Sequence, residues 1–356
     1  MTLPTVLQIP SHMTYAKALG PAHTTPEVAS PTLRIADLLA QPRWDFDIVH
    51  LHSLELVTLD DLIQLRKRTV AEGVRLVATI HDLVPNIEAN VGDFLTKVAY
   101  IAAEADHVFT LTPQAAEQIA ALAPHAEPAE ITPHGAAISI ESIPAVPVRG
   151  SGGLAVFGAF RPYRELEILV RSWQHLGDER PNLRVLLRSV TRADQERDAA
   201  LLDLLEETAR TDPRLHLTVA HTMLGDDDLV DWLTGASALV LPYSHITHSG
   251  QLELARDIGL PVIAPDIASL HGQLTTGPRK HLPVAWFALD SLTVDDFPTC
   301  LRHASELAMD TADRSSATAT EDQEHVRAVR LAERAEISER HADVYANLLT
   351  KTGERV

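Results

Sequence analysis

The chain has 356 residues, 45% of them hydrophobic, and a formal net charge of −19 from 49 acidic and 30 basic side chains. This length is enough for two domains with separate cores. The acidic balance argues against nucleic acid as a partner, because binding nucleic acid requires a basic surface. Solubility alone explains the excess of acidic residues. An anionic ligand would therefore need a local basic site.

The first predicted element is a strand at Thr5–Pro10. No charged segment precedes its apolar run, so it is not typical of a signal peptide. Later apolar runs are too short to cross a bilayer, and no Lys/Arg-rich amphipathic helix predicts binding to a membrane surface. The single cysteine, Cys300, cannot form an internal disulfide, in keeping with a reducing compartment. We expect a cytoplasmic protein without stable membrane insertion.

In the rest of the first half, short β-branched runs alternate with longer amphipathic stretches, a pattern typical of βαβ units around a parallel sheet. The predicted strands are Phe46–Ser53, Arg75–Asp82, His107–Thr112 and Ala129–His134. The predicted helices are Leu59–Glu72, Gly92–Ala105 and Pro113–Leu122. Proline suits the first turn of the last helix, because its missing N–H is not needed there.

Residues 136–153 interrupt this pattern with Pro144, Pro147 and a Gly-Ser-Gly-Gly run. Such a composition is typical of a linker. We therefore expect one domain over residues 1–148 and a second over residues 149–325.

The same alternation resumes in the second half. The predicted strands are Leu154–Ala159, Leu183–Val190, Leu215–His221, Ala238–Ser244 and Leu260–Pro265. The predicted helices are Glu165–Leu176, Arg192–Arg210, Asp226–Gly235 and Gln251–Ile258, and the charged segment 326–356 is expected as a C-terminal helix packing back on the first domain. Two doubly wound α/β halves imply a cleft between them, with ligands outside the carboxyl ends of the strands.

Two arginines, Arg161 and Arg164, follow the first strand of the second half. Cations are disfavoured at a helix N-terminus, so their presence needs a reason. A diphosphate held by guanidinium groups is one reason, and ion pairs with Glu165 or Glu167 are another.

A second polar segment follows the strand Ala238–Ser244, where Thr247, Ser249 and Gly250 open a helix. Free backbone N–H groups at the positive end of a helix suit a phosphate. An ordinary N-cap by Ser249 explains the same residues.

Histidines supply the remaining candidates for chemistry. His81 follows the buried run Leu76–Ile80 and is suited either to proton transfer near neutral pH or to capping a neighbouring carbonyl. His50 and His52 face the same side of a strand, but Asp47 and Glu55 are too loosely placed to complete a metal site.

The acidic run Asp226–Asp228 is explained as the first turn of a helix. We expect no metal site and no cofactor.

Taken in order, several segments over about residues 45–275 resemble family-4-like bacterial glycosyltransferases of the GT-B fold, in particular an exopolysaccharide-type subgroup. They are Asp47–His52, Ala78–Asp82, Ala105–Val108, Ile131–Gly135, Phe157–Arg164, Leu241–Tyr243, Thr247–Gly250 and Gly259–Ala264. The resemblance implies two Rossmann-like domains facing a central cleft, acceptor-side and donor-side. It also implies metal-independent transfer of a sugar from a nucleotide-diphosphate sugar to a hydroxyl group.

By this resemblance, Arg161 and Arg164 hold the donor diphosphate, with Arg164 in place of the usual lysine, and His81 contacts the transferred sugar. Further candidate donor-binding residues are Ser11, His12, Gly158, Arg188, Tyr243, Thr247, Ser249, Gly250, Gln251 and Glu253.

The sequence departs from the family at a pair of glutamates seven residues apart, whose places are held by Ile246 and Leu254. Glu253 is the nearest carboxylate that could reach a ribose hydroxyl. A catalytically altered GT-B protein stays open as an alternative: a nucleotide-sugar-binding protein, a sugar-nucleotide epimerase or a pseudo-glycosyltransferase. The sequence does not identify the nucleotide, the sugar or the stereochemical outcome of the reaction. The acceptor can be a sugar, a lipid-linked molecule or a small molecule, and a homodimer is possible.

Overall fold

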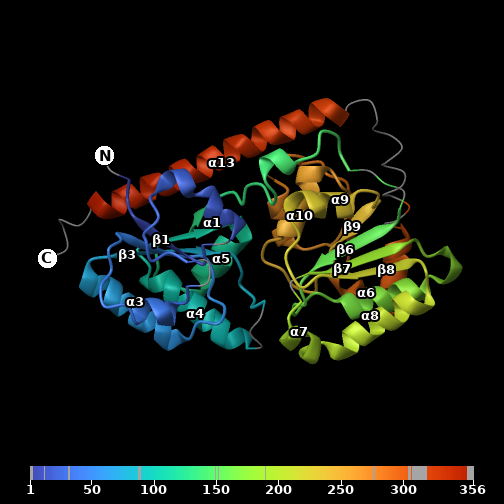
Figure 1. Ribbon diagram of the computed structural model, residues 1–356, viewed down its shortest axis with the longest axis horizontal. Coiled ribbons are helices and arrows are strands. Elements are labelled where there is room, and N and C mark those ends of the chain that lie inside the picture. The colour runs from blue at the N-terminus through green and yellow to red at the C-terminus, as the bar shows by residue number, and fades with distance from the viewer. Residues whose placement is uncertain are drawn as a thin grey trace. The chain divides into compact units, whose positions relative to one another are not determined.

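The computed structural model describes residues 3–11, 13–30, 33–86, 90–148, 150, 152–188, 190–275, 277–303, 306 and 319–350. The chain divides into two compact units (Figure 1). The first unit comprises Met1–Gly135, Ile246–His248 and Arg330–Val356, and the second comprises Ala136–His245 and Ser249–Val329. The second unit thus begins at the start of the stretch expected to be a linker.

The first unit is built on a parallel five-stranded sheet in the order β1-β2-β3-β4-β5. The strands are β1 (Val6–Ile9), β2 (Ile48–Leu51), β3 (Arg75–Ile80), β4 (His107–Thr110) and β5 (Glu130–Ile131). The helices are α1 (Thr14–Ala18), α2 (Ile35–Leu39), α3 (Leu59–Glu72), α4 (Val91–Glu104) and α5 (Pro113–Leu122). Each strand is shorter than predicted; β3, for example, ends at Ile80, before His81 and Asp82.

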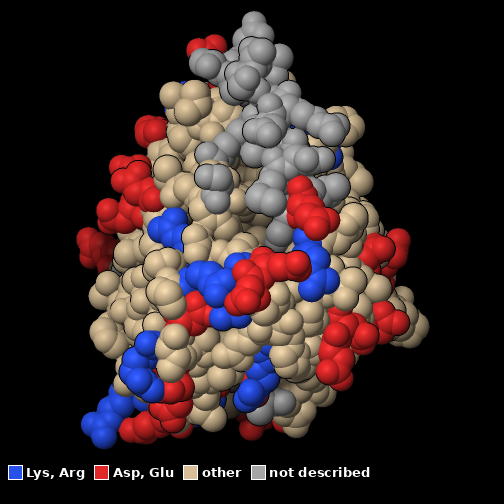
Figure 2. Space-filling view, turned by 90° about the vertical axis from the view of Figure 1, so that its right-hand side faces the viewer, with Lys and Arg blue, Asp and Glu red and all other residues tan. Residues whose placement is uncertain are grey.

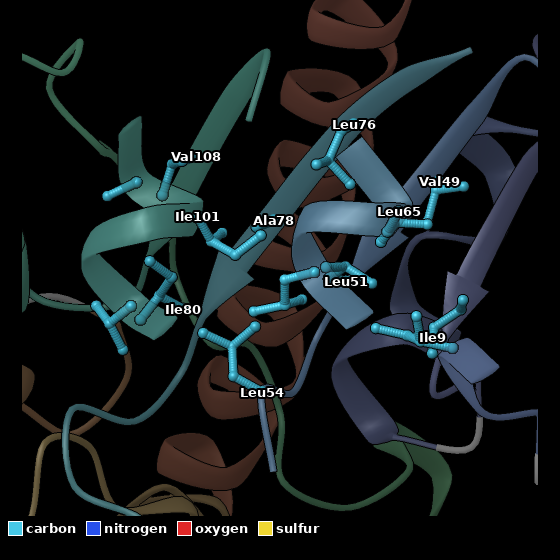
Figure 3. Packing of buried hydrophobic residues seen from close by; sticks show 14 of the residues in the cluster. Ile9, Val49, Leu51, Leu54, Leu65, Leu76, Ala78, Ile80, Ile101 and Val108 are labelled. Carbon is cyan, nitrogen blue, oxygen red and sulfur yellow. The ribbon is translucent and has the colours of Figure 1, made fainter. Parts of the chain in front are cut away.

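One face of this sheet is apolar and packs against α3, α4 and α5 (Figure 3). Alternate strand residues such as Val49, Leu51, Ala78 and Ile80 point to this face, as the two-residue period of a strand requires. Ile101 of α4 is among the helix side chains that cover them.

The opposite face changes character along the strands. It carries Ile48, Val77 and Phe109, which pack with Tyr345 of the helix α13 (Ala319–Thr350). Toward the carboxyl end on this face, β2 passes from Ile48 to His50 and β3 passes from Val77 to Thr79. The sheet therefore has one apolar face and one face that becomes polar where ligands bind in parallel sheets.

The second unit is built on a parallel six-stranded sheet in the order β11-β10-β9-β6-β7-β8. The strands are β6 (Leu154–Gly158), β7 (Leu183–Leu187), β8 (Leu215–Val219), β9 (Ala238–Val240), β10 (Val262–Pro265) and β11 (Val284–Phe287). The helices are α6 (Leu166–His175), α7 (Arg192–Arg197), α8 (Ala199–Thr211), α9 (Asp226–Leu233), α10 (Gly250–Ile258) and α11 (Ala268–Gln273).

Two features of this unit differ from the sequence-based expectation. The single helix predicted over Arg192–Arg210 is two helices, because Asp198 leaves helical geometry (φ −108°, ψ 26°). The edge strand β11 was not expected. Its residues Val284, Ala285 and Trp286 are only half-buried, as is usual for a strand at the edge of a sheet.

Helices cover both faces of the second sheet. In Figure 1, α6 and α8 lie on one side, and α9 and α10 lie on the other. Trp173 of α6 is fully buried against the strands. On the molecular face shown in Figure 2, Lys and Arg side chains lie beside Asp and Glu rather than forming a patch of one sign.

Helix α13 contributes residues to both units: those up to Val329 belong to the second and those from Arg330 to the first. Within the first unit, Ile337 packs with Tyr15, and the Leu348 carbonyl accepts a hydrogen bond from Arg75. No helix in the described ranges is long and apolar enough to cross a membrane.

Candidate active site

The loop that joins β6 to α6 is fixed against the end of β9. The amide of Ser244 donates to the Tyr163 carbonyl at 3.0 Å, and the amide of Glu165 donates to the Pro242 carbonyl at 2.8 Å. Tyr163 has φ +62°, a conformation that costs free energy in a non-glycine residue and that clusters at functional sites. The backbone that carries the two candidate arginines is therefore held in a defined and strained path.

Arg164 lies across the end of β6. Its Nη1 donates to the Ala159 carbonyl at 2.8 Å, and its Nη2 donates to Tyr243 Oη at 3.3 Å. A side chain at Gly158 (φ +138°) would place Cβ 1.9 Å from Nη1, so only glycine leaves room for this guanidinium group. The Nε of Arg164 is buried and has no hydrogen-bond partner in the described part of the chain.

Arg188 follows the neighbouring strand β7, and its amide donates to the Gly158 carbonyl at 3.1 Å. Its guanidinium carbon lies 5.1 Å from the centre of the Phe157 ring. Burial, together with the positive charges of Arg164 and Arg161, lowers the pKa of Arg188 to about 10. Arg188 therefore lies close enough to Arg164 and Arg161 to be repelled by both.

The two carboxylates considered as partners for Arg164 bind other groups. Glu167 pairs with Arg171 at 2.8 Å, and Glu165 accepts a hydrogen bond from Ser244 Oγ. Within the described ranges, neither Arg164 nor Arg188 forms an ion pair. Two neighbouring guanidinium groups without a carboxylate partner in the described ranges, those of Arg164 and Arg188, are the arrangement expected for a polyanionic ligand.

The start of α10 is an ordinary capped helix. Ser249 Oγ accepts from the Leu252 amide at 3.1 Å, as expected of an N-cap, and the Ser249 amide donates to Gln273 Oε1 at 3.0 Å. Gly250 is exposed, and an added Cβ would have no atom within 4 Å. The helix start thus presents backbone at Gly250, whereas the hydroxyl of Ser249 serves the helix itself.

Tyr243 and Gln251 connect α10 to the arginine loop. Tyr243 Oη donates to Gln251 Oε1 at 3.0 Å, and Gln251 Nε2 donates to the Phe157 carbonyl. Both side chains are buried. Their contacts in the second unit position Arg164 through Tyr243 and leave little of either side chain exposed to a ligand.

Glu253 is an interior residue. Its carboxylate accepts from Arg256 Nη1 at 3.0 Å and from Gln273 Nε2 at 2.9 Å, and the side chain is buried. The hypothesis that it reaches a ribose hydroxyl therefore conflicts with an internal ion pair, and the geometry favours a structural role.

The carboxyl edge of the first sheet gathers other candidate residues. Ser11 follows β1 and is half-buried, and His12 lies outside the described residues. Thr247 is buried in the first unit, where its Oγ1 accepts a hydrogen bond from the Leu83 amide at 2.9 Å. The sequence predicted that the Thr247 hydroxyl binds the donor substrate, but in the structure this hydroxyl fixes the loop just after His81.

His81 sits in a group of histidine and tyrosine rings in the first unit. The Tyr15 ring meets it edge-on, with centroids 5.1 Å apart, and the His52 ring is 5.9 Å away. Tyr15 in turn donates to Thr132 Oγ1 at 3.4 Å. Burial, followed by the neighbouring histidines, lowers the pKa of His81 well below its usual value. The ring is therefore neutral at neutral pH.

The Nε2 atom of His81 is buried and has no partner among the residues that the structure describes. Buried polar atoms are nearly always hydrogen-bonded, so an atom without a protein partner is a candidate contact for a ligand or water. The sequence also allowed His81 to donate a hydrogen bond to a neighbouring carbonyl, but Nε2 makes no such bond in the described part of the chain.

The histidine pair considered as metal ligands is bonded to protein groups, His50 to Tyr345 and Thr79, and His52 to Gln8. In the acidic run, Asp226 accepts from the Ser139 amide at 2.7 Å and lies in the first turn of α9. Among the described residues, no group of three or more His, Cys, Asp or Glu side chains could hold a metal ion.

Sequence reasoning missed Tyr15, Thr132, His134, His248 and His341. His341 Nε2 lies 3.5 Å from Tyr15 Oη, although the two residues are 326 positions apart. The His134 and His248 rings stack at 4.7 Å. No local pattern relates such residues, which come from α1, α13, the segment after β5 and the segment Ile246–His248, so only tertiary packing brings them together.

A pocket of about 640 Å³ in the second unit lies at the other end of the strands, where Leu154 and Asn182 adjoin the starts of β6 and β7. Arg180 and Arg302 line it, and each pairs with a carboxylate, Arg180 with Asp212 and Arg302 with Glu179. It is therefore distinct from the arginine group at the carboxyl ends.

No protein-family model matches the chain. Among curated proteins, the GDP-mannose:glycolipid 4-beta-D-mannosyltransferase of Xanthomonas campestris pv. campestris is 29% identical over 114 residues, 32% of this chain and 30% of that protein. The match thus spans about a third of the length of either protein.

The fold is similar to solved glycosyltransferase structures. The Anabaena protein HepE, solved with UDP-glucose, has a TM-score of 0.63 at 13% identity, covering 88% of this chain and 82% of that one. A glycosyltransferase from Rickettsia africae ESF-5 has a TM-score of 0.64 at 10% identity, covering 99% and 100%. TarM has a TM-score of 0.54 at 13% identity, covering 85% and 54%. The α/β fold of the GT-B class expected from the sequence is confirmed.

Proposed function

We propose that this protein is a glycosyltransferase that moves a sugar from a nucleotide-diphosphate donor to an acceptor hydroxyl group. The observation that carries the proposal is the group of Arg161, Arg164 and Arg188 around Gly158, at the carboxyl ends of β6 and β7. A diphosphate would relieve the repulsion between these cations and accept hydrogen bonds from their N–H groups.

Chemically, the acceptor oxygen would form a bond to the anomeric carbon as the bond from that carbon to the diphosphate oxygen breaks. The reaction releases a nucleoside diphosphate and a proton. Guanidinium groups held in place before the donor binds would stabilise the charge that develops on the diphosphate. They supply the positive charge that a divalent cation provides in other enzymes, so we propose transfer without a metal or other cofactor.

His81 would contribute as a neutral hydrogen-bonding group. A ring whose pKa is well below its usual value is a weak base near neutral pH. Its buried Nε2 is suited to a sugar hydroxyl, which can donate to or accept from an imidazole nitrogen. We therefore propose that His81 orients the transferred sugar.

The solved HepE structures contain UDP or UDP-glucose, and the Xanthomonas relative is named for GDP-mannose. The first donors to test are therefore UDP-glucose and GDP-mannose. A nucleotide that binds only the native state raises its thermal stability. We expect UDP or GDP to raise the melting temperature, and we expect the matching nucleotide sugar to be turned over.

The outcomes separate the alternatives. Nucleotide binding without any transfer or donor hydrolysis would favour a nucleotide-sugar-binding protein, whereas the absence of nucleotide binding would reject the proposal. Activity should persist in excess EDTA. Loss of activity in EDTA that Mg²⁺ or Mn²⁺ restores would contradict metal independence.

A further inference from the structure

His50 and His52 are adjacent on the same face at the end of β2, with ring centroids 4.2 Å apart, but their hydrogen bonds differ. Both nitrogens of His50 are satisfied: Nδ1 lies 2.7 Å from Tyr345 Oη, and Nε2 lies 2.8 Å from Thr79 Oγ1. His52 uses only Nε2, which lies 2.5 Å from Gln8 Oε1. Its Nδ1 is buried and has no partner in the described ranges of the chain.

The neighbouring groups define the chemistry of this nitrogen. Gln8 Nε2 donates to Tyr345 Oη at 3.4 Å, an orientation that leaves Gln8 Oε1 as the acceptor for His52. The Nε2 of His52 therefore carries the hydrogen atom. Burial lowers the pKa of His52 to about 3, so the ring is neutral. Its Nδ1 is then a hydrogen-bond acceptor that lacks a donor.

The position of His52 in the fold points to a substrate. It follows the last residue of β2, and His81 follows the last residue of the adjacent strand β3. Each ring has one buried nitrogen without a partner among the described residues, and the Tyr15 ring packs edge-on against both. Ligands of parallel sheets bind at this edge, outside the carboxyl ends of the strands.

We infer that His52 is a substrate-contacting residue whose Nδ1 accepts a hydrogen bond from a carbohydrate hydroxyl group. This inference rests on the proposed function, in which hydroxyl groups come from two sources, the transferred sugar and the acceptor. His50, saturated by Tyr345 and Thr79, has no such capacity and serves the packing of α13 on the sheet.

Two substitutions at His52 separate its two nitrogens. His52→Gln places an amide near the position of Nε2, so it keeps the contact with Gln8 and removes the acceptor. His52→Asn places an amide near the position of Nδ1, so it keeps an acceptor and loses Gln8. His50→Gln is the matched control, because it alters a ring of equal burial on the same face.

With UDP-glucose and GDP-mannose as donors, we expect His52→Gln to keep the melting temperature and the affinity for UDP or GDP. We expect its turnover to fall by about 10- to 100-fold, the range for one lost hydrogen bond to substrate. His52→Asn should melt earlier yet retain more turnover per folded molecule. His50→Gln should lose stability with a smaller change in turnover.

Two readouts identify the source of the hydroxyl. If it belongs to the transferred sugar, His52→Gln loses the difference in affinity between UDP-glucose and UDP, or between GDP-mannose and GDP. If it belongs to the acceptor, donor hydrolysis by water is unchanged and transfer to methyl glycosides falls. Wild-type affinity and turnover in His52→Gln, or an equal fall in turnover in His50→Gln, would overturn the inference.

If the wild type binds none of these donors, the proposed function fails, but His52 can still be tested. The ring nitrogens of ¹⁵N-labelled protein report hydrogen bonding directly in NMR spectra. A change at His52 Nδ1 on adding methyl glucoside or methyl mannoside would support a hydroxyl site, and an unchanged resonance at saturating sugar would reject it.

Discussion

At the scale of single residues, Gly158 and Arg164 depend on each other. The guanidinium group occupies the volume that a β-carbon at position 158 would need, so the pair can form only with glycine. Arg164 gains hydrogen bonds to Ala159 and Tyr243 but no carboxylate partner in the described structure. Its charge is thus oriented by the protein without being neutralised.

We expect Arg164→Ala to weaken the binding of UDP or GDP by about 1.5–3 kcal/mol, the scale of a hydrogen bond to a charged group. This corresponds to about a 10- to 150-fold rise in Kd, measured by calorimetry. Arg171→Ala is the control, since Arg171 is exposed and pairs with Glu167 on the surface of α6. An unchanged Kd in Arg164→Ala would remove this residue from the donor site.

His81→Asn should bind the nucleotide like the wild type, because the arginine group belongs to the second unit. Transfer should fall by about 10- to 100-fold, as expected for the loss of one hydrogen bond in the transition state. The low pKa of His81 further implies that its protonation does not limit the rate between pH 6 and 8. A loss above about 1,000-fold, or a kcat that follows the titration of one group near pH 6.5 and loses this dependence in the variant, would instead indicate proton transfer by the imidazole.

At the scale of elements, sequence patterns predicted α3 and α5 at their observed bounds, because each combines a clear apolar stripe with a capping threonine, Thr58 or Thr112. They failed at Asp198, where a continuous amphipathic pattern hides a break. They also predicted the arginines at strand ends. The ring cluster around Tyr15 was missed because its members come from α1, α13 and four separate loops, which only tertiary packing unites.

The segment Ile246–His248 is an element of the first unit although its flanking residues belong to the second. We expect Thr247→Val to leave the Leu83 amide without its acceptor, at a cost of about 1–3 kcal/mol. The melting temperature of the first unit should fall, and Thr247→Ser should restore it. Nucleotide affinity should not change. A variant with normal stability and weakened UDP or GDP binding would return Thr247 to the donor site, as its sequence motif suggested.

At the scale of the whole molecule, histidines whose pKa is lowered by burial are concentrated in the first unit, and His245 is an example in the second. Burial lowers the pKa of His341 to about 4 and that of His52 to about 3, and it lowers the pKa values of His23, His50 and His81 as well. All five belong to the first unit. Their neutral rings are built into its hydrogen-bonded interior, so its stability is linked to pH.

The direction of this linkage follows from the pKa shifts. Above about pH 6.5 the rings are neutral in both the folded and unfolded chain, and the stability they contribute is complete. Below that pH the histidines bind protons in the unfolded chain but stay neutral in the folded unit, where their pKa values are lower. Each such histidine then removes up to about 1.4 kcal/mol of stability per pH unit, until the pH reaches its folded pKa.

We therefore expect the first unit to lose several kcal/mol between pH 6.5 and 5, where carboxylates are still largely ionised and contribute little. Native-state hydrogen exchange at pH 7.5, 6.5, 5.8 and 5.0, corrected for intrinsic exchange rates, measures the stability of each unit separately. Protection of β2 and β3 should fall steeply while protection of β6 and β7 falls less. The slope of stability against pH in the first unit should fall in His52→Gln by up to about 1.4 kcal/mol per pH unit, the effect of one proton. His175→Gln, at an exposed position in the second unit, should leave this slope unchanged. A first unit whose stability is constant from pH 7.5 to 5.0 would mean that these rings accept protons in the folded state, by local opening of α1 or α13.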